Sequence, residues 1–290
     1  MVKKKIFIIG SRGQLGSFLS KNLNLNQKKY KIYLSQNYKF KFVYFKKQIN
    51  IIEKLAPDLI INCSGYTDVD FAEKNRKVSK LLNHRCVKYL SNYCKKKDVI
   101  LIHFSTDYVF SGKNQFYEPS HKCNPVNYYG YTKYLGEEEI KKLNFKFYIF
   151  RISWLLSSSK LSFLTKIKKK LQSEKKVEVI YDSVSCPTTV IFINKFLKKN
   201  IDYFFTKNNK GVYHLVNPVC LSFYRMAKII EKIIFKRNAN IINKVEYKNY
   251  NPIAKRPKIS KLSIKKTREN FKIPKNLLLN DVKSLLNEKY

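Results

Sequence analysis

The amino-acid sequence predicts an α/β protein built on a doubly wound parallel sheet, with a smaller domain toward the C-terminus. Short apolar runs alternate with segments of helical periodicity through the first half of the chain, as in successive β–α–β units. A turn with three glycines joins the first apolar run to the first helical segment. Small and polar residues follow the later runs, where parallel strands would gather them at one edge of the sheet.

The first unit carries the pattern of a nucleotide-binding turn. Residues 6–9 form a buried-strand run, Gly10-Ser-Arg-Gly13-Gln-Leu-Gly16 follows, and leucines at helical spacing come next. Gly10 permits a tight turn, Gly13 lets backbone amides approach a pyrophosphate, and Gly16 lets helix and strand pack closely. The N-terminus of the helix adds positive potential for phosphates. An ordinary glycine-bearing turn is the alternative, but the strand–turn–helix context favours a Rossmann-like cofactor site.

The end of the second strand bears on the choice of cofactor. A site that prefers NAD places Asp or Glu there to hold the ribose hydroxyls. After the expected strand at 30–34 this chain has Ser35-Gln36-Asn37, with no acid. Arg12, just before the middle glycine, puts a cation where it can meet a 2′-phosphate. Both features favour NADPH, with NADH left possible.

The remaining elements follow in order along the chain. We expect a short third strand at 42–45, a fourth at 57–62, a fifth at 99–104 and a sixth at 145–152, with helices at 49–55, at 73–94 and from Tyr129 onward. In the second half we expect strands at 177–180 and 211–216 and helices at 161–171, after 189, at 223–234 and from 279. Residues 1–155 are predicted to form the NAD(P)-binding Rossmann domain, with 187–216 returning to it, and 156–290 to form mainly the substrate-binding domain.

Three residues have the spacing that carbonyl reduction requires. Tyr129 and Lys133 are four residues apart, so on a helix they share one face. A lysine ammonium favours the phenolate and lowers the tyrosine pKa from about 10, which suits proton exchange with a carbonyl or hydroxyl. Thr106, at the carboxyl end of a strand, can bond the same oxygen. In a chain with 21 tyrosines an incidental pair is the alternative, but the glycine turn and the strand-end threonine favour a catalytic one.

Longer motifs extend this pattern nearly from end to end. They are Gly13-Gln14-Leu15-Gly16, the segment from Ile61 to Asp70, Ser105-Thr-Asp-Tyr-Val-Phe110-Ser-Gly112, Asn124-Pro-Val-Asn-Tyr-Tyr129-Gly-Tyr-Thr-Lys133, Arg151-Ile-Ser153-Trp154, Cys186-Pro187-Thr188, Tyr213-His214-Leu215 and Arg256-Pro257. With these motifs the chain resembles the extended short-chain dehydrogenase/reductases and, more narrowly, the dTDP-4-dehydrorhamnose reductase family. It departs from that family at Cys63-Ser64-Gly65, where three alanines are usual.

The resemblance implies a role for each matching residue. Tyr129 would donate the proton, Lys133 would lower its pKa and bind the ribose, and Thr106 would polarise the carbonyl. Thr106 would also contact the sugar nucleotide, with Asp107, Tyr108 and Trp154. The expected cofactor-binding residues are Gly10, Arg12, Gly13, Gln14, Leu15, Gly16, Gly65, Tyr66, Thr67, Tyr129 and Lys133.

The activity implied is NAD(P)H-dependent reduction of the C4 keto group of a nucleotide-activated 4-keto-6-deoxy sugar. Within the family this is dTDP-4-dehydrorhamnose to dTDP-L-rhamnose, a step of cell-surface polysaccharide biosynthesis. Another sugar-nucleotide reductase or epimerase remains an alternative. So does a non-catalytic nucleotide-binding regulatory subunit, although the joint presence of Thr106, Tyr129 and Lys133 argues against it.

Composition bounds the partners. The formal charge of +39 raises the question of nucleic acid, but the lysines are spread along the whole chain, as compositional drift would leave them, so we expect no nucleic-acid partner. No apolar run approaches the roughly 18 residues of a membrane span, and the N-terminal one is too short for a signal peptide. We therefore expect a cytoplasmic protein. A homodimer is left open as its assembly. Six cysteines without metal-ligand spacing predict reduced thiols and no metal site.

Overall fold

The computed structural model describes residues 2–237, 239–250 and 252–288. Its centre is a parallel sheet of six strands in the order β10-β5-β4-β3-β1-β2. The strands are β1 (Lys4–Ile9), β2 (Tyr30–Leu34), β3 (Leu59–Asn62), β4 (Ile100–Thr106), β5 (Phe147–Ile152) and β10 (Gly211–His214). The chain builds outward from β1 to one side and from β3 to the other, so the sheet is doubly wound, which confirms the predicted fold class.

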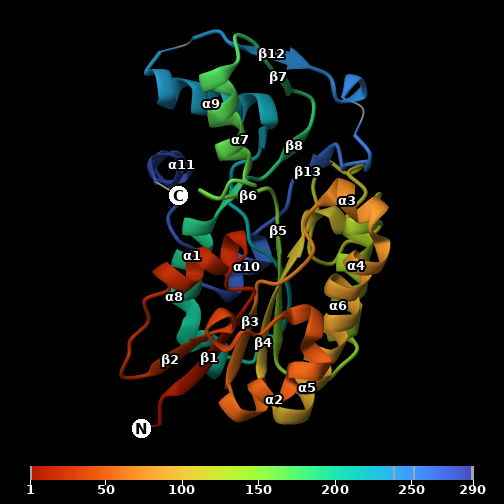
Figure 1. The fold of residues 1–290 in the computed structure, drawn as a ribbon, viewed down its shortest axis with the longest axis vertical. Coiled ribbons are helices and arrows are strands. Elements are labelled where there is room, and N and C mark those ends of the chain that lie inside the picture. The colour runs from red at the N-terminus through yellow and green to blue at the C-terminus, as the bar shows by residue number, and fades with distance from the viewer. Residues whose placement is uncertain (1, 238, 251, 289–290) are drawn as a thin grey trace.

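Helices cover both faces of this sheet. In Figure 1, α1 (Gln14–Asn22) and α8 (Val190–Thr206) lie to the left of the sheet, and α5 (Cys86–Lys97) and α6 (Tyr128–Lys141) lie to the right. Also on the right-hand side are α2 (Phe45–Leu55), α3 (Val69–Lys74), α4 (Arg76–Lys80) and the π-helical turn η3 (Leu81–Arg85). The single long helix expected at 73–94 is therefore divided into four segments.

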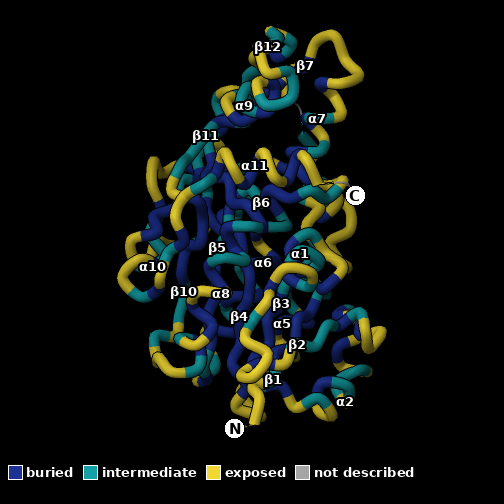
Figure 2. The backbone as a smooth tube through the Cα atoms, turned by 90° about the vertical axis from the view of Figure 1, so that its left-hand side faces the viewer, coloured by how far each residue is buried: buried dark blue, intermediate teal, exposed yellow. Residues whose placement is uncertain are grey.

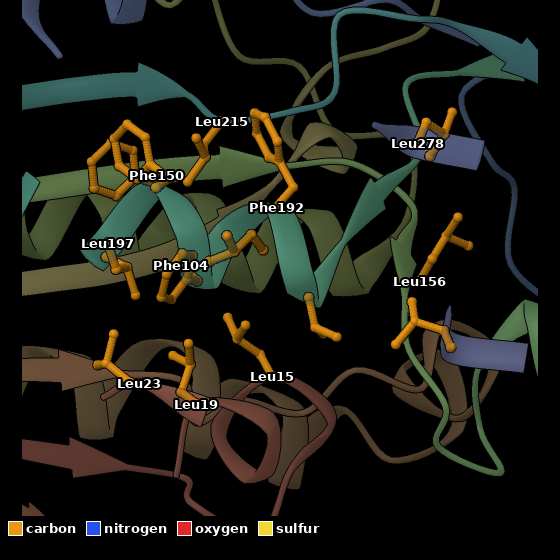
Figure 3. Close-up of a cluster of buried hydrophobic side chains, with 14 of the residues drawn as sticks. Leu15, Leu19, Leu23, Phe104, Phe150, Leu156, Phe192, Leu197, Leu215 and Leu278 are labelled. Carbon is orange, nitrogen blue, oxygen red and sulfur yellow. The ribbon is translucent and has the colours of Figure 1, made fainter. Parts of the chain in front are cut away.

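The core follows the alternation of side chains along the strands. On β1, Ile6 and Ile8 point into one hydrophobic cluster and Phe7 and Ile9 into the other, one cluster on each face of the sheet. Figure 3 shows part of the first cluster, in which Leu15 and Leu19 of α1 and Leu23, which follows it, face side chains of α8 and of the strands β4 and β5. The strands at the centre of the sheet are buried along their length (Figure 2).

A smaller lobe stands above the carboxyl edge of the sheet, at the top of Figure 1. Its helices are α7 (Phe163–Ser173), α9 (Phe223–Phe235), α10 (Lys265–Asn270) and α11 (Leu278–Asn287), of which α10 lies lower, beside β10. Its short strands are β6 (Leu155–Leu156), β7 (Val177–Ile180), β8 (Val184–Ser185), β9 (Thr188–Thr189), β11 (Leu221–Ser222), β12 (Ile242–Val245) and β13 (Ile259–Ser260). Within 187–216, β10 joins the large sheet and α8 packs against α1. The proposed domain boundary at residue 155 stays a prediction.

The prediction of a strand at 42–45 is wrong. Phe42–Tyr44 form a 3₁₀ helix, η2, and Phe45 begins α2. Aromatic residues favour strands only where they can pack on a pleated surface. Here Phe42 and Phe40 each pack edge-to-face on Phe45, and Phe40 also packs on Phe7 of β1. This aromatic cluster caps the sheet instead of extending it, which leaves β2 as the edge strand.

The prediction that all thiols are reduced is also wrong. Cys186 and Cys220 form a disulfide, whereas Cys63, Cys86, Cys94 and Cys123 are free. The reason lies in strand pairing: Ser185 of β8 is opposite Leu221 of β11 in an antiparallel pair, so the two neighbouring cysteines meet. Across the described ranges, no helix combines the length and apolarity that a membrane span needs.

Candidate active site

Two elements bring Thr106 and Tyr129 together. Thr106 ends β4, and Tyr129 lies in the first turn of α6, whose N-terminus is capped by the Asn127 side chain. Asn127 Oδ1 accepts from Gly130 N at 2.8 Å. A Cβ at Gly130 would lie 2.1 Å from the Tyr108 carbonyl oxygen, so only glycine allows α6 to come this close to the turn after β4. The Tyr129 ring packs edge-to-face on Tyr108, with centroids 5.8 Å apart.

Asp107 fixes the side chain of Thr106 through a hydrogen bond. Its carboxylate is buried and accepts hydrogen bonds from Thr106 Oγ1 at 3.1 Å, Ser153 Oγ at 2.8 Å and Ser260 Oγ at 2.5 Å. Thr106 ends β4, Ser153 follows β5 and Ser260 ends β13, so one carboxylate ties three segments together. Burial raises the pKa of Asp107, and the hydroxyl donors offset part of the rise. The substrate contact expected of Asp107 stays a prediction; the contacts described here position Thr106.

The protonation states of Tyr129 and Lys133 are governed by burial. Burial raises the pKa of Tyr129 to about 12, although a hydrogen bond with Thr106 lowers it. Burial likewise lowers the pKa of Lys133 to about 8. We predicted that Lys133 lowers the pKa of the tyrosine, but in this arrangement the lysine does not offset the rise, because its Nζ donates to the Phe104 carbonyl oxygen at 2.6 Å. Tyr129 is therefore held as a phenol across the physiological pH range, as a proton donor requires.

The glycine turn has the shape that a dinucleotide needs. Gly10 has φ +78°, and a Cβ at Gly16 would lie 2.1 Å from Gly10 O, so α1 packs closely on the end of β1. Gly13 is exposed, and a Cβ there would contact only Gly10 O, at 3.3 Å. No side chain caps α1 within the described residues, which leaves the first N–H groups at Gln14 and Leu15 for an anion. The residues present thus fit a dinucleotide pyrophosphate.

Arg12 lies next to the end of β2. Ser11 Oγ is 3.0 Å from Ser35 Oγ and accepts from Gln36 N at 3.0 Å, which joins the glycine turn to the segment after β2. Arg12 is exposed, and none of the salt bridges among the described residues involves it. The cation therefore stands free beside the position where an acid would hold an adenosine ribose.

Asn83, which was not among the predicted site residues, supports the loop at 65–67 that is predicted to bind the cofactor. Asn83 is buried in the π-helical turn η3, accepts from Tyr66 N at 2.8 Å and donates to Tyr66 O at 3.0 Å. It also donates to Thr132 Oγ1 at 3.1 Å, which connects this loop to α6. π-Helical turns often occur at functional sites. Nothing in the sequence signals this role, because Asn83 is followed by the equally polar His84 and Arg85.

A cavity of about 660 Å³ opens in the smaller lobe, with Tyr108 from the carboxyl edge of the large sheet in its wall. Its lining includes Tyr108, Phe163, Lys166, Lys170, Arg256 and Ser260. Arg256 Nη2 donates to Asp70 Oδ2 at 2.6 Å, which fixes the guanidinium at the cavity wall. Four basic side chains line the cavity beside aromatic rings, Lys166, Lys170, Lys176 and Arg256, together with Glu174 and Glu178. Such a lining suits a ligand that is anionic at one end and planar at the other.

Trp154 lies just behind this cavity. Its ring packs on Phe163 and Phe223, with centroids 5.1 and 4.3 Å apart, and both of those rings line the cavity. The backbone of Trp154 has φ +43°, which is strained for a bulky residue. Its Nε1 is buried with no hydrogen-bond partner among the described residues. A strained residue with an unpaired donor beside a cavity is typical of a ligand contact, so the predicted substrate role of Trp154 remains a prediction with this support.

Comparison with known proteins identifies the family. The model of the family described as "RmlD substrate binding domain" matches residues 4–290. The chain belongs to this family. It is similar to the dTDP-4-dehydrorhamnose reductase of Aggregatibacter actinomycetemcomitans, with 28% identity over 93% of this chain and 94% of the relative. A further relative, the dTDP-4-dehydrorhamnose reductase of Shigella flexneri, is 29% identical over 82% of this chain and 81% of its own.

A solved structure of this RmlD family extends the similarity to three dimensions. It is dTDP-4-dehydrorhamnose reductase from Bacillus anthracis in complex with NADP, with a TM-score of 0.87 and 27% identity. The alignment covers 99% of this chain and 100% of that one. The family predicted from the motifs is therefore confirmed. Across the described ranges, no group of three or more His, Cys, Asp or Glu side chains is placed to hold a metal ion.

Proposed function

We propose that this chain is an NADPH-dependent reductase of the C4 keto group of a nucleotide-activated 4-keto-6-deoxy sugar. The substrate we propose is dTDP-4-dehydrorhamnose, as the names of the RmlD relatives suggest. One observation carries the proposal: Thr106 and Tyr129 meet, with Lys133 one turn along α6, at the carboxyl edge of a sheet that also presents the glycine turn. Hydride transfer to a ketone needs these groups at this edge.

The chain's own residues have distinct tasks in this reaction. A bound nicotinamide cofactor would supply the hydride, and the protein supplies orientation and the proton. Thr106, whose hydroxyl donates to Asp107 in the free protein, would turn that one proton to the carbonyl oxygen, and Tyr129 O–H gives its proton to that oxygen as negative charge develops there. The Gly10–Gly16 turn would hold the pyrophosphate, and Gly65, Tyr66 and Thr67 would line the cofactor on the other side, with Asn83 as their support.

The decisive experiment is a panel of nucleotide 4-keto sugars offered with NADPH and with NADH, following the loss of reduced-cofactor absorbance. Reduction of a 4-keto-6-deoxy sugar supports the proposal. Interconversion of two sugars without net cofactor use would instead identify an epimerase. Cofactor binding without turnover on any substrate would identify the regulatory subunit.

The first prediction concerns cofactor preference. A charge-assisted hydrogen bond from Arg12 to a 2′-phosphate contributes roughly 1.5–3 kcal/mol when well aligned. At about 1.4 kcal/mol per tenfold this corresponds to about ten- to a hundredfold in preference, and the exposure of Arg12 favours the lower figure. Arg12→Ala should therefore reduce the ratio of kcat/KM for NADPH to that for NADH by about tenfold.

Lys21→Ala is the matched control, because it removes one exposed cation from the far end of α1, the helix that follows the Arg12 turn. Its ratio should equal that of the wild type. An unchanged ratio in Arg12→Ala, or equal use of both cofactors by the wild type, would show that Arg12 does not read the phosphate.

The second prediction concerns the charge of +39. If the excess of lysine is compositional drift, duplex DNA should bind weakly, without sequence preference and with a steep salt dependence. Fluorescence anisotropy with two unrelated duplexes over a range of salt concentrations measures the affinity, the sequence preference and the salt dependence. Tight and sequence-selective binding at physiological salt would contradict the prediction.

A cytoplasmic location and a homodimer remain proposals.

A further inference from the structure

A buried chain of polar groups runs behind the catalytic lysine. Ser64 N donates to Asn62 Oδ1 at 3.0 Å, and Asn62 Nδ2 lies 3.0 Å from His103 Nδ1. His103 Nε2 in turn lies 3.4 Å from Lys133 Nζ. Asn62 and His103 are fully buried at opposing positions of β3 and β4, and Lys133 is 5% exposed. This series of hydrogen-bonded groups therefore connects the end of β3 to α6 in the protein interior.

The direction of each hydrogen bond follows from its neighbour. A backbone N–H can only donate, so Ser64 requires Asn62 Oδ1 to accept and turns the amide NH₂ toward His103. His103 Nδ1 must then accept from Asn62. Burial and the nearby lysine hold the pKa of His103 well below its usual value, so the ring is neutral and carries its one proton on Nε2.

That proton faces Lys133. An ammonium has three donors and no acceptor, so it cannot accept from His103 Nε2–H. A neutral amine can, because it has a lone pair, and one of its own N–H groups remains for the Phe104 carbonyl oxygen at 2.6 Å. Other titratable groups face the lysine as well: Cys63 after β3 and Glu137 on α6 both favour the charged amine. Glu137, however, is already paired with Arg151.

We propose that His103 is a positioning residue that donates from Nε2 to the neutral amine of Lys133 and so stabilises that form of the lysine. The role in catalysis rests on the proposed function. After Tyr129 gives its proton to the substrate oxygen, a phenolate remains that must regain one proton in each turnover; Lys133, one turn along α6, would supply that proton as an ammonium and become the amine that His103 holds. Lys133 then recovers a proton from solvent, so each turnover takes up one proton. A lysine that titrates near the working pH is suited to this exchange.

The test is the titration of Lys133 in the free protein, which needs neither cofactor nor substrate. The side-chain ¹³Cε resonance of ¹³C-lysine-labelled protein reports the amine, and its loss in Lys133→Arg assigns it. We expect a midpoint near pH 8 in the wild type. In His103→Leu it should rise by about one unit or more toward the ordinary value of about 10.4, because the neutral amine loses its donor.

Two further variants separate this role from simple packing. His103→Gln keeps an acceptor for Asn62 and a donor for Lys133, so its midpoint should stay near that of the wild type. Asn62→Asp replaces the amide donor with an acceptor, which moves the imidazole proton to Nδ1 and leaves Nε2 to accept from an ammonium. Its midpoint should therefore rise even though His103 is intact, and it serves if His103→Leu does not fold.

Equal Lys133 midpoints in the wild type and in Asn62→Asp or a folded His103→Leu would overturn the proposed role of His103. The proposed reductase function would still stand. The expected midpoints in a protein that reduces no keto sugar would contradict the proposed function instead. In an active enzyme, the pH profile of kcat should shift in His103→Leu and be restored in His103→Gln.

Discussion

Replacement of Tyr129 by phenylalanine should lower turnover of a verified substrate by on the order of a hundredfold or more, the usual contribution of a positioned general acid. The variant removes only the hydroxyl that gives the proton. The pKa of Tyr129 is raised to about 12 by burial, so the wild-type phenol stays protonated and can act as the acid. Steady-state kcat with saturating NADPH measures the effect, and the thermal unfolding midpoint checks that the fold is intact.

Tyr131→Phe is the matched control for this variant. Tyr131 lies on the same helix two residues later, but its side chain is exposed and away from Thr106. It should keep the kcat of the wild type. Near-normal turnover in Tyr129→Phe would remove Tyr129 from the proton-donating role, and the epimerase and regulatory alternatives would then need to be weighed again.

The placement of the proposed catalytic residues Thr106, Tyr129 and Lys133 could be predicted from sequence because it is mostly local. Tyr129 and Lys133 need only a helix to share a face, and Thr106 needs only to end a strand of a parallel sheet. The cofactor turn is equally local: strand, three glycines and helix follow one another within a few residues. Each of these patterns constrains the backbone before any tertiary contact forms.

What the sequence could not predict depends on side chains far apart in the chain. The pairing of Cys186 with Cys220 follows from the register of β8 against β11, which no spacing shows. Asn83 and His103 act through residues 17 and 30 positions away. The protonation states of Tyr129 and Lys133 were mispredicted for a related reason: a helical pair suggests a charge–charge effect, whereas burial by the surrounding sheet outweighs it.

The largest effect on stability is expected at a buried ion pair that fixes α6 to the sheet. Arg151 of β5 and Glu137 of α6 have side chains 2% and 0% exposed, and two nitrogens of the guanidinium donate to the carboxylate at 2.7–3.2 Å. The third donates to Pro119 O at 3.1 Å. Removing one partner of such a pair leaves an uncompensated buried charge, which destabilises by about 3–5 kcal/mol. Glu137→Leu should therefore lower the free energy of unfolding by about that amount.

The comparison that isolates the charge is a double variant. Glu137→Leu with Arg151→Met removes both charges and should be less destabilised than Glu137→Leu alone, because no unpaired ion remains in the core. Urea unfolding of the wild type, Glu137→Leu, Arg151→Met and the double variant measures the difference. Glu138→Leu breaks the exposed pair with Lys141 on the same helix and should cost no more than about 1 kcal/mol.

The same pair bears on the active site, because α6 carries both Tyr129 and Lys133. If Glu137–Arg151 fixes the helix against β5, the double variant should unfold at higher urea than Glu137→Leu yet bind NADPH less tightly than the wild type, since apolar contacts do not define the orientation of α6 as a bidentate ion pair does. An additive double variant, as destabilised as the sum of its parts, would mean that the two side chains act independently and that packing alone positions the catalytic helix.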